Sequence, residues 1–353
     1  MIKKTREIIE SIYSALICWN LFLKKEYKFG FKNLLKRLKL ILKGFNSQRK
    51  IPYDFNKWKY KDYISDMEYH KLAFINRPYN KLLNNKLIFS NYFSYFFIVP
   101  ENYCVIKNNT IVNVNRNMPV NSFYDFQKVL ETGIKFIGKP LYGLSGSGVF
   151  MIRFSEGNYY VNNNRYDITE FQRIIFSLND YLITEFIEQG DFTKTIYPYS
   201  TNTIRIITMV DPDTLLPFIP LATLRFGTSK SAPVDNFAQG GIYSYINIQN
   251  GELSQVFSSE GNEFNAFSAH PETKELIEGK IVPGWENISR QIINAAKLNA
   301  LLLKIVGWDI IITNNGFVVI EGNSGPDTTI QWTEYPMAKN PHVIRFLHSN
   351  KIR

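Results

Sequence analysis

Residues 308–323 read WDIIITNNGFVVIEGN, and this stretch decides the fold and the site that we expect. Two apolar runs flank Asn314-Asn315-Gly316, and Asn-Gly between such runs is a strong short-range signal of a β-hairpin. With a three-residue loop over 314–316, Asp309 lies directly opposite Glu321, and Asn323 follows on the same face because side chains alternate along a strand. The sequence therefore predicts a hairpin that brings two carboxylates and an amide together.

The length of that loop decides whether these side chains share a face. A two-residue loop instead places Asp309 opposite Gly322 and turns Glu321 to the other face of the sheet. In the three-residue register the two carboxylates repel each other unless a cation lies among them, and hard oxygen ligands favour magnesium. The alternative is a buried hairpin whose charged ends are solvated.

A glycine-rich segment, GLSGSG at residues 143–148, follows an expected strand over 135–140 that ends near Lys139. Glycine lets backbone N–H groups approach a phosphate closely, because no Cβ is in the way. The segment lacks the Gly-Lys-Ser/Thr ending of a P-loop, and no helix is expected after it, which excludes that fold. It is either a phosphate-binding loop or the flexible tip of a hairpin.

Hydrophobic periodicity predicts the surrounding elements. We expect a helix over 123–131 with Ser122 as its N-cap, and a long helical pattern over 288–306. The other expected elements are a helix over 169–178, strands over 149–154, 159–166 and 181–187, and strand pairs across 203–224 and 242–257.

The composition is that of an ordinary globular protein. The chain has 353 residues, 45% hydrophobic and 20% charged, which suffices for two or three lobes with their own cores. Only Cys18 and Cys104 are present, so the sequence encodes neither a disulfide framework nor a Cys/His zinc site, and a reducing cytoplasm suits it.

The net charge of +10 is concentrated in the first part of the chain. Residues 1–50 hold 13 Lys and Arg against 3 Asp and Glu, out of 41 and 31 in total, so residues 51–353 are balanced at 28 each. Because that remainder is neutral and carries no nucleic-acid-binding motif, we expect no nucleic-acid partner.

The basic segment has a helical pattern of its own. Apolar residues between Phe31 and Leu42 recur at helical spacing with lysines on the other face, which predicts a basic amphipathic helix. The apolar run 12–23 is too short to span a bilayer, which needs about 20 residues, and acidic residues near the start argue against a cleaved signal. Residues 1–45 are therefore either a peripheral anchor on the anionic inner membrane leaflet or a helical cap on the main body.

Taken in order, these features resemble the ATP-grasp superfamily, most closely its sugar-transfer associated branch, and the chain is also similar to glutamate-adding carboxylate-amine ligases. The likeness covers roughly residues 80–330. Its landmarks, in chain order, are Asn85-Lys86, Lys139-Pro140, Gly143 to Gly148, Thr184 to Ile187, Asn202 to Arg205, Arg225, Asp235-Asn236, Gly240-Gly241, His270-Pro271, Gly307 to Asp309 and Glu321 to Asn323.

The resemblance implies an α+β (α/β) architecture, the ATP-grasp fold, in which two α+β lobes grip ATP behind an N-terminal basic amphipathic helical segment. The implied divisions are residues 1–50 for that basic segment, 51–130 for a region before the grasp, 131–187 for the small lobe with its phosphate loop, and 188–353 for the large lobe with its magnesium site.

The same resemblance implies a role for each matching residue. ATP would be held by the phosphate-binding lysines Lys86 and Lys139, by the loop residues Gly143, Ser145, Gly146, Ser147 and Gly148, and by the adenine-binding linker Glu185, Phe186, Ile187 and Glu188. Two Mg2+ ions would be held by Asp309, Glu321 and Asn323. The implied catalytic residues are Arg205 and Arg225, which steady the transferred phosphoryl group, and the implied substrate residues are Asn202, Asn236, Gly240 and Gly241.

Three points remain open at this level. His270 is either the base that accepts a proton from the amine or a histidine in a surface loop. Some ATP-grasp ligases place an arginine two residues before the first metal aspartate, but this chain has Gly307 there, so another cation must serve. The phosphate loop also has no lysine.

The function implied is that of an ATP-dependent carboxylate-amine ligase that forms an amide through an acyl-phosphate. Its substrates would be a small-molecule or glycan carboxylate and an amine or amino acid, in the modification of a cell-surface polysaccharide such as capsule or O-antigen, or of its precursor. The alternatives are an ATP-grasp kinase that phosphorylates a sugar hydroxyl and a non-catalytic nucleotide-binding scaffold of a glycan-synthesis complex. A cytoplasmic location is expected, peripheral to the inner membrane face if residues 1–45 bind it, and no oligomeric state is predicted.

Overall fold

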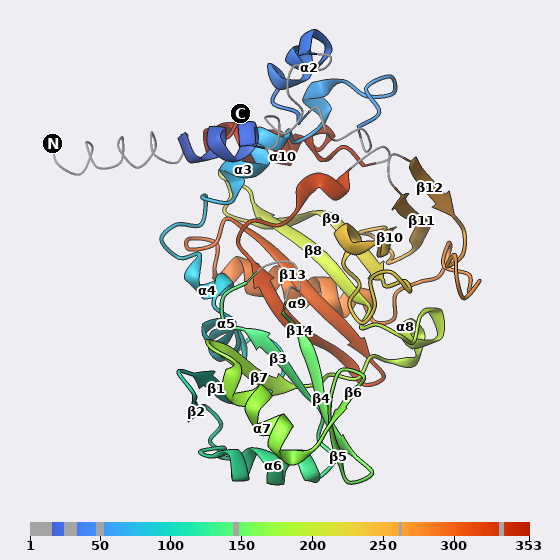
Figure 1. Ribbon diagram of the computed structural model, residues 1–353. Coiled ribbons are helices and arrows are strands. Elements are labelled where there is room, and N and C mark those ends of the chain that lie inside the picture. Colours follow the sequence, from blue (N-terminus) through green and yellow to red (C-terminus); the bar gives the residue numbers. More distant parts are fainter. Residues whose placement is uncertain (1–15, 25–33, 47–52, 144–147, 261–262, 332–334) are drawn as a thin grey trace, which may run out of the picture.

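Two antiparallel β-sheets of seven strands each form the two lobes of the molecule (Figure 1). The computed structural model describes residues 16–24, 34–46, 53–143, 148–260, 263–331 and 335–353. Every pairing between neighbouring strands within these sheets is antiparallel. The α+β class expected from the sequence is confirmed.

The small lobe is a sheet in the order β2-β1-β7-β3-β4-β5-β6 against which two helices pack. Helix α6 begins as predicted at Ser122, whose hydroxyl accepts a hydrogen bond from the Asp125 backbone N–H. Phe126 and Leu130, four residues apart on α6, are fully buried in the core that the sheet shares with α7. The elements of this lobe are β1 (Asn102–Lys107), β2 (Thr110–Asn113), α6 (Phe123–Glu131), β3 (Phe136–Pro140), β4 (Phe150–Ser155), β5 (Asn158–Val161), β6 (Asn164–Tyr166), α7 (Ile168–Ser177) and β7 (Tyr181–Glu185).

The boundary of this lobe differs from the division expected at residue 131. Strand β1 pairs with β7, so residues 102–113 belong to the same sheet as residues 136–185. Hydrophobic alternation identifies a strand but not its partner, and the long-range pairing therefore could not be read from the sequence.

The large lobe is a sheet in the order β12-β11-β10-β9-β8-β13-β14, with helices on both faces. Alternation along β8 sends Ile204 and Ile206 to the face covered by α9, and Ile207 and Met209 to the face covered by α10. The strands of this lobe are β8 (Thr203–Val210), β9 (Pro217–Phe226), β10 (Ile242–Ile246), β11 (Leu253–Glu260), β12 (Glu263–Phe267), β13 (Ile305–Thr313) and β14 (Gly316–Asn323). Its helices are α8 (Asp191–Ile196), α9 (Trp285–Leu298) and α10 (Pro341–Ser349), with short 3-10 turns at Phe237–Gln239, Thr328–Gln331 and Met337–Lys339.

The helix expected over 288–306 is shorter than its apolar pattern. Helix α9 ends at Leu298, and Asn299 caps it with backbone N–H bonds to preceding carbonyls and a side-chain bond to Ala295 O at 2.8 Å. The apolar residues that follow belong to a turn and to the start of β13 at Ile305. Buried strands and buried helices are both apolar throughout, so periodicity alone could not separate them here.

The region before residue 102 is helical and packs on the large lobe. It contains α2 (Leu34–Ile41), a 3-10 turn at Tyr60–Asp62, α3 (Asp66–Leu72), α4 (Lys81–Asn84) and α5 (Lys86–Phe93). Residues 16–24 are also helical, and Cys18 and Phe22 are buried there in a small cluster with Met67. Among the described residues, no helix has the length and apolar character needed to cross a membrane.

Candidate functional site

The hairpin of β13 and β14 has a two-residue turn, not the three-residue turn expected. Thr313 pairs with Gly316, which leaves Asn314 and Asn315 as the turn. The register then shifts by one residue between Ile310 and Asp309, so that β14 carries one extra residue, Ile320, as a β-bulge. The predicted loop length is therefore wrong, but the bulge restores the pairing that a longer loop would have produced.

Because of that bulge, Asp309 pairs with Glu321 as the three-residue register required. The side chain of Asn323 lies beside both, with its Nδ2 3.5 Å from Asp309 Oδ2 and 3.4 Å from Glu321 Oε1. On the other side of β13, Asp309 pairs with Arg205 of β8. One row across three strands thus reads Arg205, Asp309, Glu321, and these side chains share the face opposite α9.

Two arginines bind the carboxylate of Asp309. Arg205 donates from Nε to Oδ1 and from Nη2 to Oδ2, the latter at 2.9 Å, and Arg225 Nη2 lies 3.3 Å from Oδ1. Burial alone would raise the pKa of Asp309, but the charges of Arg205 and Arg225 outweigh it and hold that pKa well below its ordinary value. Asp309 is therefore ionised in this arrangement.

Glu321 sits in the opposite electrostatic situation. Burial and the negative charge of Asp309 raise the pKa of Glu321, and Lys86 only partly opposes them, with its Nζ 4.0 Å from Glu321 Oε2. Burial also acts on Lys139, whose pKa it lowers to about 8, although the negative charge of Glu321 acts in the opposite direction. Positive charge therefore compensates Glu321 less closely than it compensates Asp309, which two arginines contact.

The donor set fits magnesium. A buried carboxylate at Asp309 faces a partly buried one at Glu321, and the amide of Asn323 lies beside them. A half-turn of that amide presents its oxygen in place of its nitrogen, which gives three hard oxygen ligands of the kind Mg2+ prefers. No cluster of three or more His, Cys, Asp or Glu suited to a metal occurs among the described residues, so the amide is needed to complete this set.

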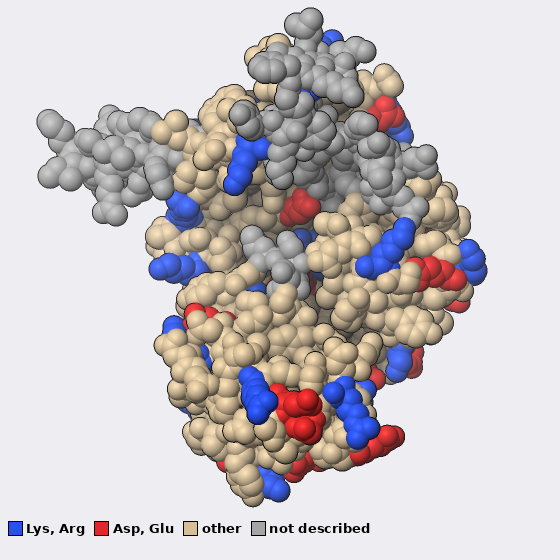
Figure 2. All heavy atoms as spheres, viewed as in Figure 1, with Lys and Arg blue, Asp and Glu red and all other residues tan. Residues whose placement is uncertain are grey.

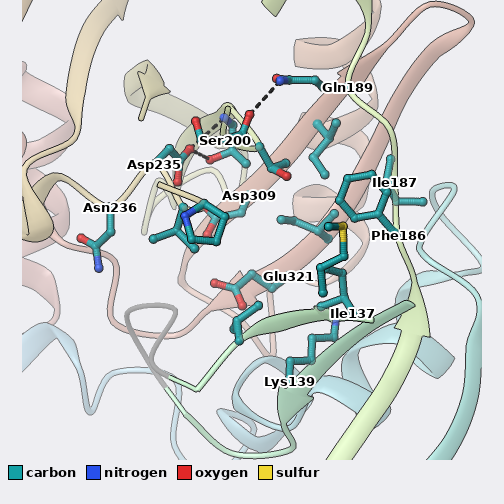
Figure 3. A pocket seen from close by; sticks show the side chains of 18 of the residues that line it. Ile137, Lys139, Phe186, Ile187, Gln189, Ser200, Asp235, Asn236, Asp309 and Glu321 are labelled. Atoms are coloured by element: carbon teal, nitrogen blue, oxygen red, sulfur yellow. Dashed lines mark hydrogen bonds between the residues drawn. The ribbon is translucent and has the colours of Figure 1, made fainter. Parts of the chain in front are cut away.

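The site opens into a cavity of about 1300 Å³ between the two lobes. Figure 2 shows this face of the molecule hollowed between the lobes, with acidic and basic side chains within the hollow. Ile137, Phe186 and Ile187 line one end, and Asp309 and Glu321 lie further in (Figure 3). An apolar slot next to a cluster of charges is the usual form of a site for a small ligand with a flat ring and charged groups.

The expected adenine-binding residues all line this cavity, on the linker that joins the lobes. The linker is held at both ends, because Phe186 N–H donates to Lys135 O at 3.0 Å and Gly190 N–H donates to Ile312 O at 2.7 Å. The Glu185 carboxylate accepts from the Glu101 backbone N–H at 3.4 Å. Glu188 forms an ion pair with Lys194 at 3.6 Å.

The ends of the expected phosphate loop are described, but Ser145, Gly146 and Ser147 lie outside the described residues. Lys86 Nζ donates to Gly143 O at 3.0 Å, so this lysine joins the start of the loop to the neighbourhood of Glu321. Gly148 has a φ of +76°, and a Cβ there would come within 2.7 Å of the Tyr181 hydroxyl. Glycine is therefore required at the exit of the loop.

Three of the expected substrate residues lie away from the cavity. Asn202 is fully buried and bonds to Gln189 and to the carbonyls of Thr193 and Tyr197, so it organises the chain that precedes β8. Gly240 and Gly241 also do not line the cavity, whereas Asn236, from the same loop, does. An ordered motif in the sequence does not distinguish a residue that contacts a ligand from one that shapes the loop beside it.

His270 is not at the surface and does not line the cavity. It is fully buried, its Nε2 lies 2.9 Å from Gly227 O, and its Nδ1 accepts from the backbone N–H groups of Glu272 and Thr273. Burial lowers the pKa of His270, so the ring is neutral, and it stacks on Tyr197 with ring centroids 4.7 Å apart. Neither ring nitrogen can reach a substrate in this arrangement, which removes the physical basis for a role as base.

Gly307 has no room for a side chain, and Arg205 lies beside it. A Cβ on Gly307 would lie 2.7 Å from Pro326 Cβ and 3.5 Å from Arg205 Cδ, so no side chain fits there. The neighbouring strand β8 instead supplies the cation beside Asp309. The position of Arg205 beside Asp309 depends on the register between β8 and β13, and no local motif in the sequence reveals that register.

Several other residues that line the cavity received no role in the sequence analysis. They include Asp235, Asp327 and Lys194, all charged, and the exposed aromatic Tyr199. Asp327 follows Asn323 by only four residues, and its charge acts on Arg205. That proximity to the expected metal asparagine was the one signal available for it.

Comparison with known proteins places these observations in a family. The chain matches the sugar-transfer associated ATP-grasp family over residues 66–340. No match was found among curated proteins. These findings agree with the resemblance noted from the sequence.

Solved structures of ATP-grasp and related ligases are similar to this chain at low identity. D-alanine–D-alanine ligase from Bacillus anthracis is 11% identical with a TM-score of 0.40, over 76% of this chain and 67% of that one. D-alanyl-alanine synthetase A from Vibrio cholerae is 9% identical with a TM-score of 0.44, over 81% and 68%. The ATP-grasp ligase PsnB, solved with a minimal precursor, is 11% identical with a TM-score of 0.39, over 77% of this chain and less than two thirds, 63%, of its own. Because the family match spans most of the chain, this protein belongs to the sugar-transfer associated ATP-grasp family.

Proposed function

We propose that this protein is an ATP-dependent carboxylate-amine ligase that forms an amide through an acyl-phosphate. The observation that carries the proposal is the row Arg205, Asp309, Glu321 across β8, β13 and β14, with Asn323 beside it, at the floor of the cavity between the lobes. Magnesium bound with ATP would neutralise phosphate charge at this row. Asp309, Glu321 and Asn323 are the residues that would hold it.

The charges around the cavity suit two anionic substrates. Lys86, Lys139, Arg205 and Arg225 line it around the expected metal site, and Asp309, Glu321, Asp235 and Asp327 are the carboxylates beside them. ATP and a carboxylate repel each other, so an enzyme that joins them must supply positive charge and hold the reacting groups in line. The lysines lie on the side of the phosphate loop and would hold phosphates, while the arginines lie beyond Asp309.

The two arginines favour a ligase over a kinase. A sugar hydroxyl carries no charge for an arginine to bind, whereas a carboxylate is the usual bidentate partner of a guanidinium. Arg205 and Arg225 both reach Asp309, so a second carboxylate next to the metal site would find the same donors. Phosphoryl transfer to a hydroxyl remains the competing reaction, and its product separates the two.

Release of ADP across a panel of acids and amines tests the proposed activity. The acids are uronic acids, nucleotide-linked uronic acids and amino acids, and the amines are amino acids and hydroxylamine. We expect ADP release that needs both an acid and magnesium, and a hydroxamate when hydroxylamine is the amine. ADP release with a phosphorylated sugar and no hydroxamate would identify a kinase. If no pair of acid and amine gives ADP release, the non-catalytic nucleotide-binding scaffold is the interpretation that is left.

The acid is proposed to be part of a carbohydrate, because the family is associated with sugar transfer. The cavity supports this by its size, since about 1300 Å³ exceeds the 300–1,000 Å³ typical of a site for one small ligand. Exposed Tyr199 at its edge offers a ring face of the kind on which sugars stack. A uronic acid that gives ADP release where a free amino acid does not would support a capsule, an O-antigen or their precursor as the substrate.

An anionic membrane surface is proposed as a partner of residues 1–45, which would place the enzyme on the cytoplasmic face. In the helix over 16–24, Cys18 and Phe22 pack on the body, while Leu16, Trp19 and Leu23 stay exposed on another side. Lys24 follows Leu23 directly in the sequence, and the first 50 residues carry 13 basic against 3 acidic side chains. We expect the chain to sediment with vesicles that contain phosphatidylglycerol and not with phosphatidylcholine alone, and a Trp19→Glu variant to sediment less. Equal sedimentation of both proteins would instead support a helical cap.

A further inference from the structure

Arg225 contacts two carboxylates, and only one of them belongs to the expected metal site. Its Nη2 lies 3.3 Å from Asp309 Oδ1, in the row described above. Its Nε lies 3.5 Å from Asp235 Oδ2 and donates to Thr203 Oγ1 at 3.1 Å, and its Nη2 donates to the same hydroxyl. The guanidinium therefore stands between two aspartates.

Thr203 connects Arg225 to Asp235 through its hydroxyl. That hydroxyl accepts from Arg225 and donates to Asp235 Oδ2 at 2.5 Å, while the Thr203 backbone N–H donates to the same oxygen at 2.8 Å. Arg225 and Thr203 pair directly across β9 and β8. The Asp235 oxygen is thus fixed against the end of a strand by two bonds before it meets the guanidinium.

Asp235 belongs to a loop whose shape leaves its carboxylate little freedom. The loop joins β9 to β10, and within it Asn236 caps the 3-10 turn Phe237–Gln239 and the Thr228 hydroxyl donates to Gly240 O at 2.8 Å. A Cβ on Gly241 would meet Asp235 O at 2.6 Å, so the backbone is closely packed there. Asp235 is buried, yet it lines the cavity (Figure 3).

Without Asp235 the balance around Arg225 would change in a defined way. Among the described residues, Asp235 and Asp309 are its two ion-pair partners. Loss of one leaves the other as the only strong attraction, and the guanidinium would turn toward Asp309, which Arg205 already binds at both oxygens. It would then offer fewer N–H groups to a substrate.

We propose that Asp235, acting with Thr203, is a positioning residue that keeps the Arg225 guanidinium from turning fully onto Asp309, so that it touches Asp309 through Nη2 and stays open to an anionic group in the cavity. The proposal rests on the function proposed above, because the anion is the substrate carboxylate. It assigns Asp235 no contact with the reacting atoms. Both its burial and its place on the cavity wall follow from this role.

Three variants separate this role from a merely structural one. Asp235→Asn keeps the size of the side chain and removes its charge, Thr203→Val removes the bridging hydroxyl, and Thr203→Ser retains that hydroxyl. The control is Asp213→Asn, an exposed aspartate in the turn between β8 and β9 on the same sheet. Thermal unfolding of each variant shows whether it folds.

The kinetic readout is the KM for the acid against the KM for ATP. With the acid that gives the fastest ADP release in the panel, we expect Asp235→Asn and Thr203→Val to raise the KM for the acid by about tenfold or more, as for loss of a charged hydrogen bond. The KM for ATP should change by less than about twofold, and Thr203→Ser should restore the wild-type value. In an Arg225→Lys background, Asp235→Asn should have little further effect, because it acts through that arginine.

A second readout does not depend on turnover and so distinguishes failure of this inference from failure of the proposed function. In protein labelled with 15N-arginine, the Arg225 Nε–H signal, assigned by its loss in Arg225→Lys, should be protected from solvent exchange. Asp235→Asn and Thr203→Val should remove that protection and Asp213→Asn should not. If the Arg225 signal stays protected in Asp235→Asn and Thr203→Val, or if both KM values rise equally, the inference is overturned. If the variants lose this protection but the wild-type protein releases no ADP with any pair of substrates, the inference stands and the proposed ligase activity is overturned.

Discussion

Glu321 is the residue at which the charge balance of the site is least favourable. It faces Asp309 directly, its side chain is only partly exposed, and its nearest lysine nitrogen is 4.0 Å away. Two like charges side by side in a region of low dielectric destabilise a fold unless a cation lies between them. This arrangement supports the proposal that the pair holds a cation, and it distinguishes the site from an ordinary cluster of surface ion pairs.

Replacing Glu321 with Gln tests this balance, because it removes one of the two facing charges and keeps the shape. We expect ADP release to fall by about 100-fold or more, since a metal-binding oxygen is lost. The temperature of unfolding should stay the same or rise, because the repulsion by Asp309 is removed. Glu156→Gln, at an exposed turn between β4 and β5, is the control. Normal ADP release by Glu321→Gln would show that the carboxylate does not bind the metal.

His270 is expected to matter for stability and not for chemistry. Its folded-state pKa is lowered by burial, so the unfolded chain binds a proton more readily than the folded one. The stability that the neutral ring contributes is therefore fully present above the unfolded pKa, about 6.5, and is lost as the pH falls below it. His270→Asn should lower the free energy of unfolding at pH 7 by about 1–3 kcal/mol and so unfold at a lower temperature. Its stability should also depend less on pH between 7 and 5.5.

The measurement for His270 is thermal unfolding from pH 5.5 to 7.5, with ADP release per folded molecule at pH 7. His348→Asn, an exposed histidine on α10, is the control and should change neither. A His270→Asn protein that unfolds like the wild type but has lost its activity would restore the role of base.

At the scale of elements, the hairpin of β13 and β14 shows what the sequence could and could not predict. The two strands, the pairing of Asp309 with Glu321 and the shared face with Asn323 were all predicted from alternation and turn residues. The loop length was not, because one extra residue can lie in the turn or in the strand with the same register at the far end. Nothing local places the bulge at Ile320.

Elements that meet only in the folded chain were beyond sequence reasoning. The clamp of Arg205 on Asp309 needs the register of β8 against β13, and Arg225 reaches Thr203 only through the register of β9 against β8. Spacing along the chain carries no information on either. The resemblance to a family named both arginines, but only the pairing shows that Arg205 lies beside Asp309 and Gly307.

The tip of this hairpin also fixes the linker between the lobes. Asn314 Oδ1 accepts from the Asp191 backbone N–H at 2.7 Å at the start of α8, and its Nδ2 lies 3.3 Å from Asp191 Oδ2. A Cβ on Gly190 would lie 2.7 Å from the Thr313 carbonyl carbon. The hairpin that carries the proposed metal ligands and the linker proposed to bind adenine are therefore joined at one point.

Two substitutions test that junction. Asn314→Ala should lower the free energy of unfolding by about 1 kcal/mol, as for loss of a capping side chain, while Asn315→Ala, its exposed neighbour in the turn, should change it little. Gly190→Ala should displace the linker and raise the KM for ATP, because the new Cβ meets backbone that cannot move aside. Equal unfolding temperatures of the two asparagine variants would show that the bond at Asp191 does not hold the junction.

The whole molecule is two lobes joined by a short linker, with the site made from both. The small lobe supplies Lys139 and the apolar wall at Ile137, and the large lobe supplies Asp309 and Glu321 (Figures 1 and 3). The family match begins at residue 66, so the basic segment lies outside it. Binding chemistry and membrane attachment are therefore expected to be separable parts of the chain.

A ligand that bridges the lobes should stabilise the whole fold, and the effect should depend on the metal. ATP with Mg2+ at 100 times its dissociation constant should stabilise the folded state by about 2.7 kcal/mol, which corresponds to a rise of roughly 4 °C in the unfolding temperature of a chain of this size. Chelation with EDTA should remove most of that rise, since the phosphates would then meet Asp309 and Glu321 with no cation between them. Asp309→Asn should behave with Mg2+ as the wild type behaves with EDTA, and Asp213→Asn should behave as the wild type. A rise of the same size with EDTA would show that nucleotide binding does not use these carboxylates, and that the lysines alone hold the phosphates.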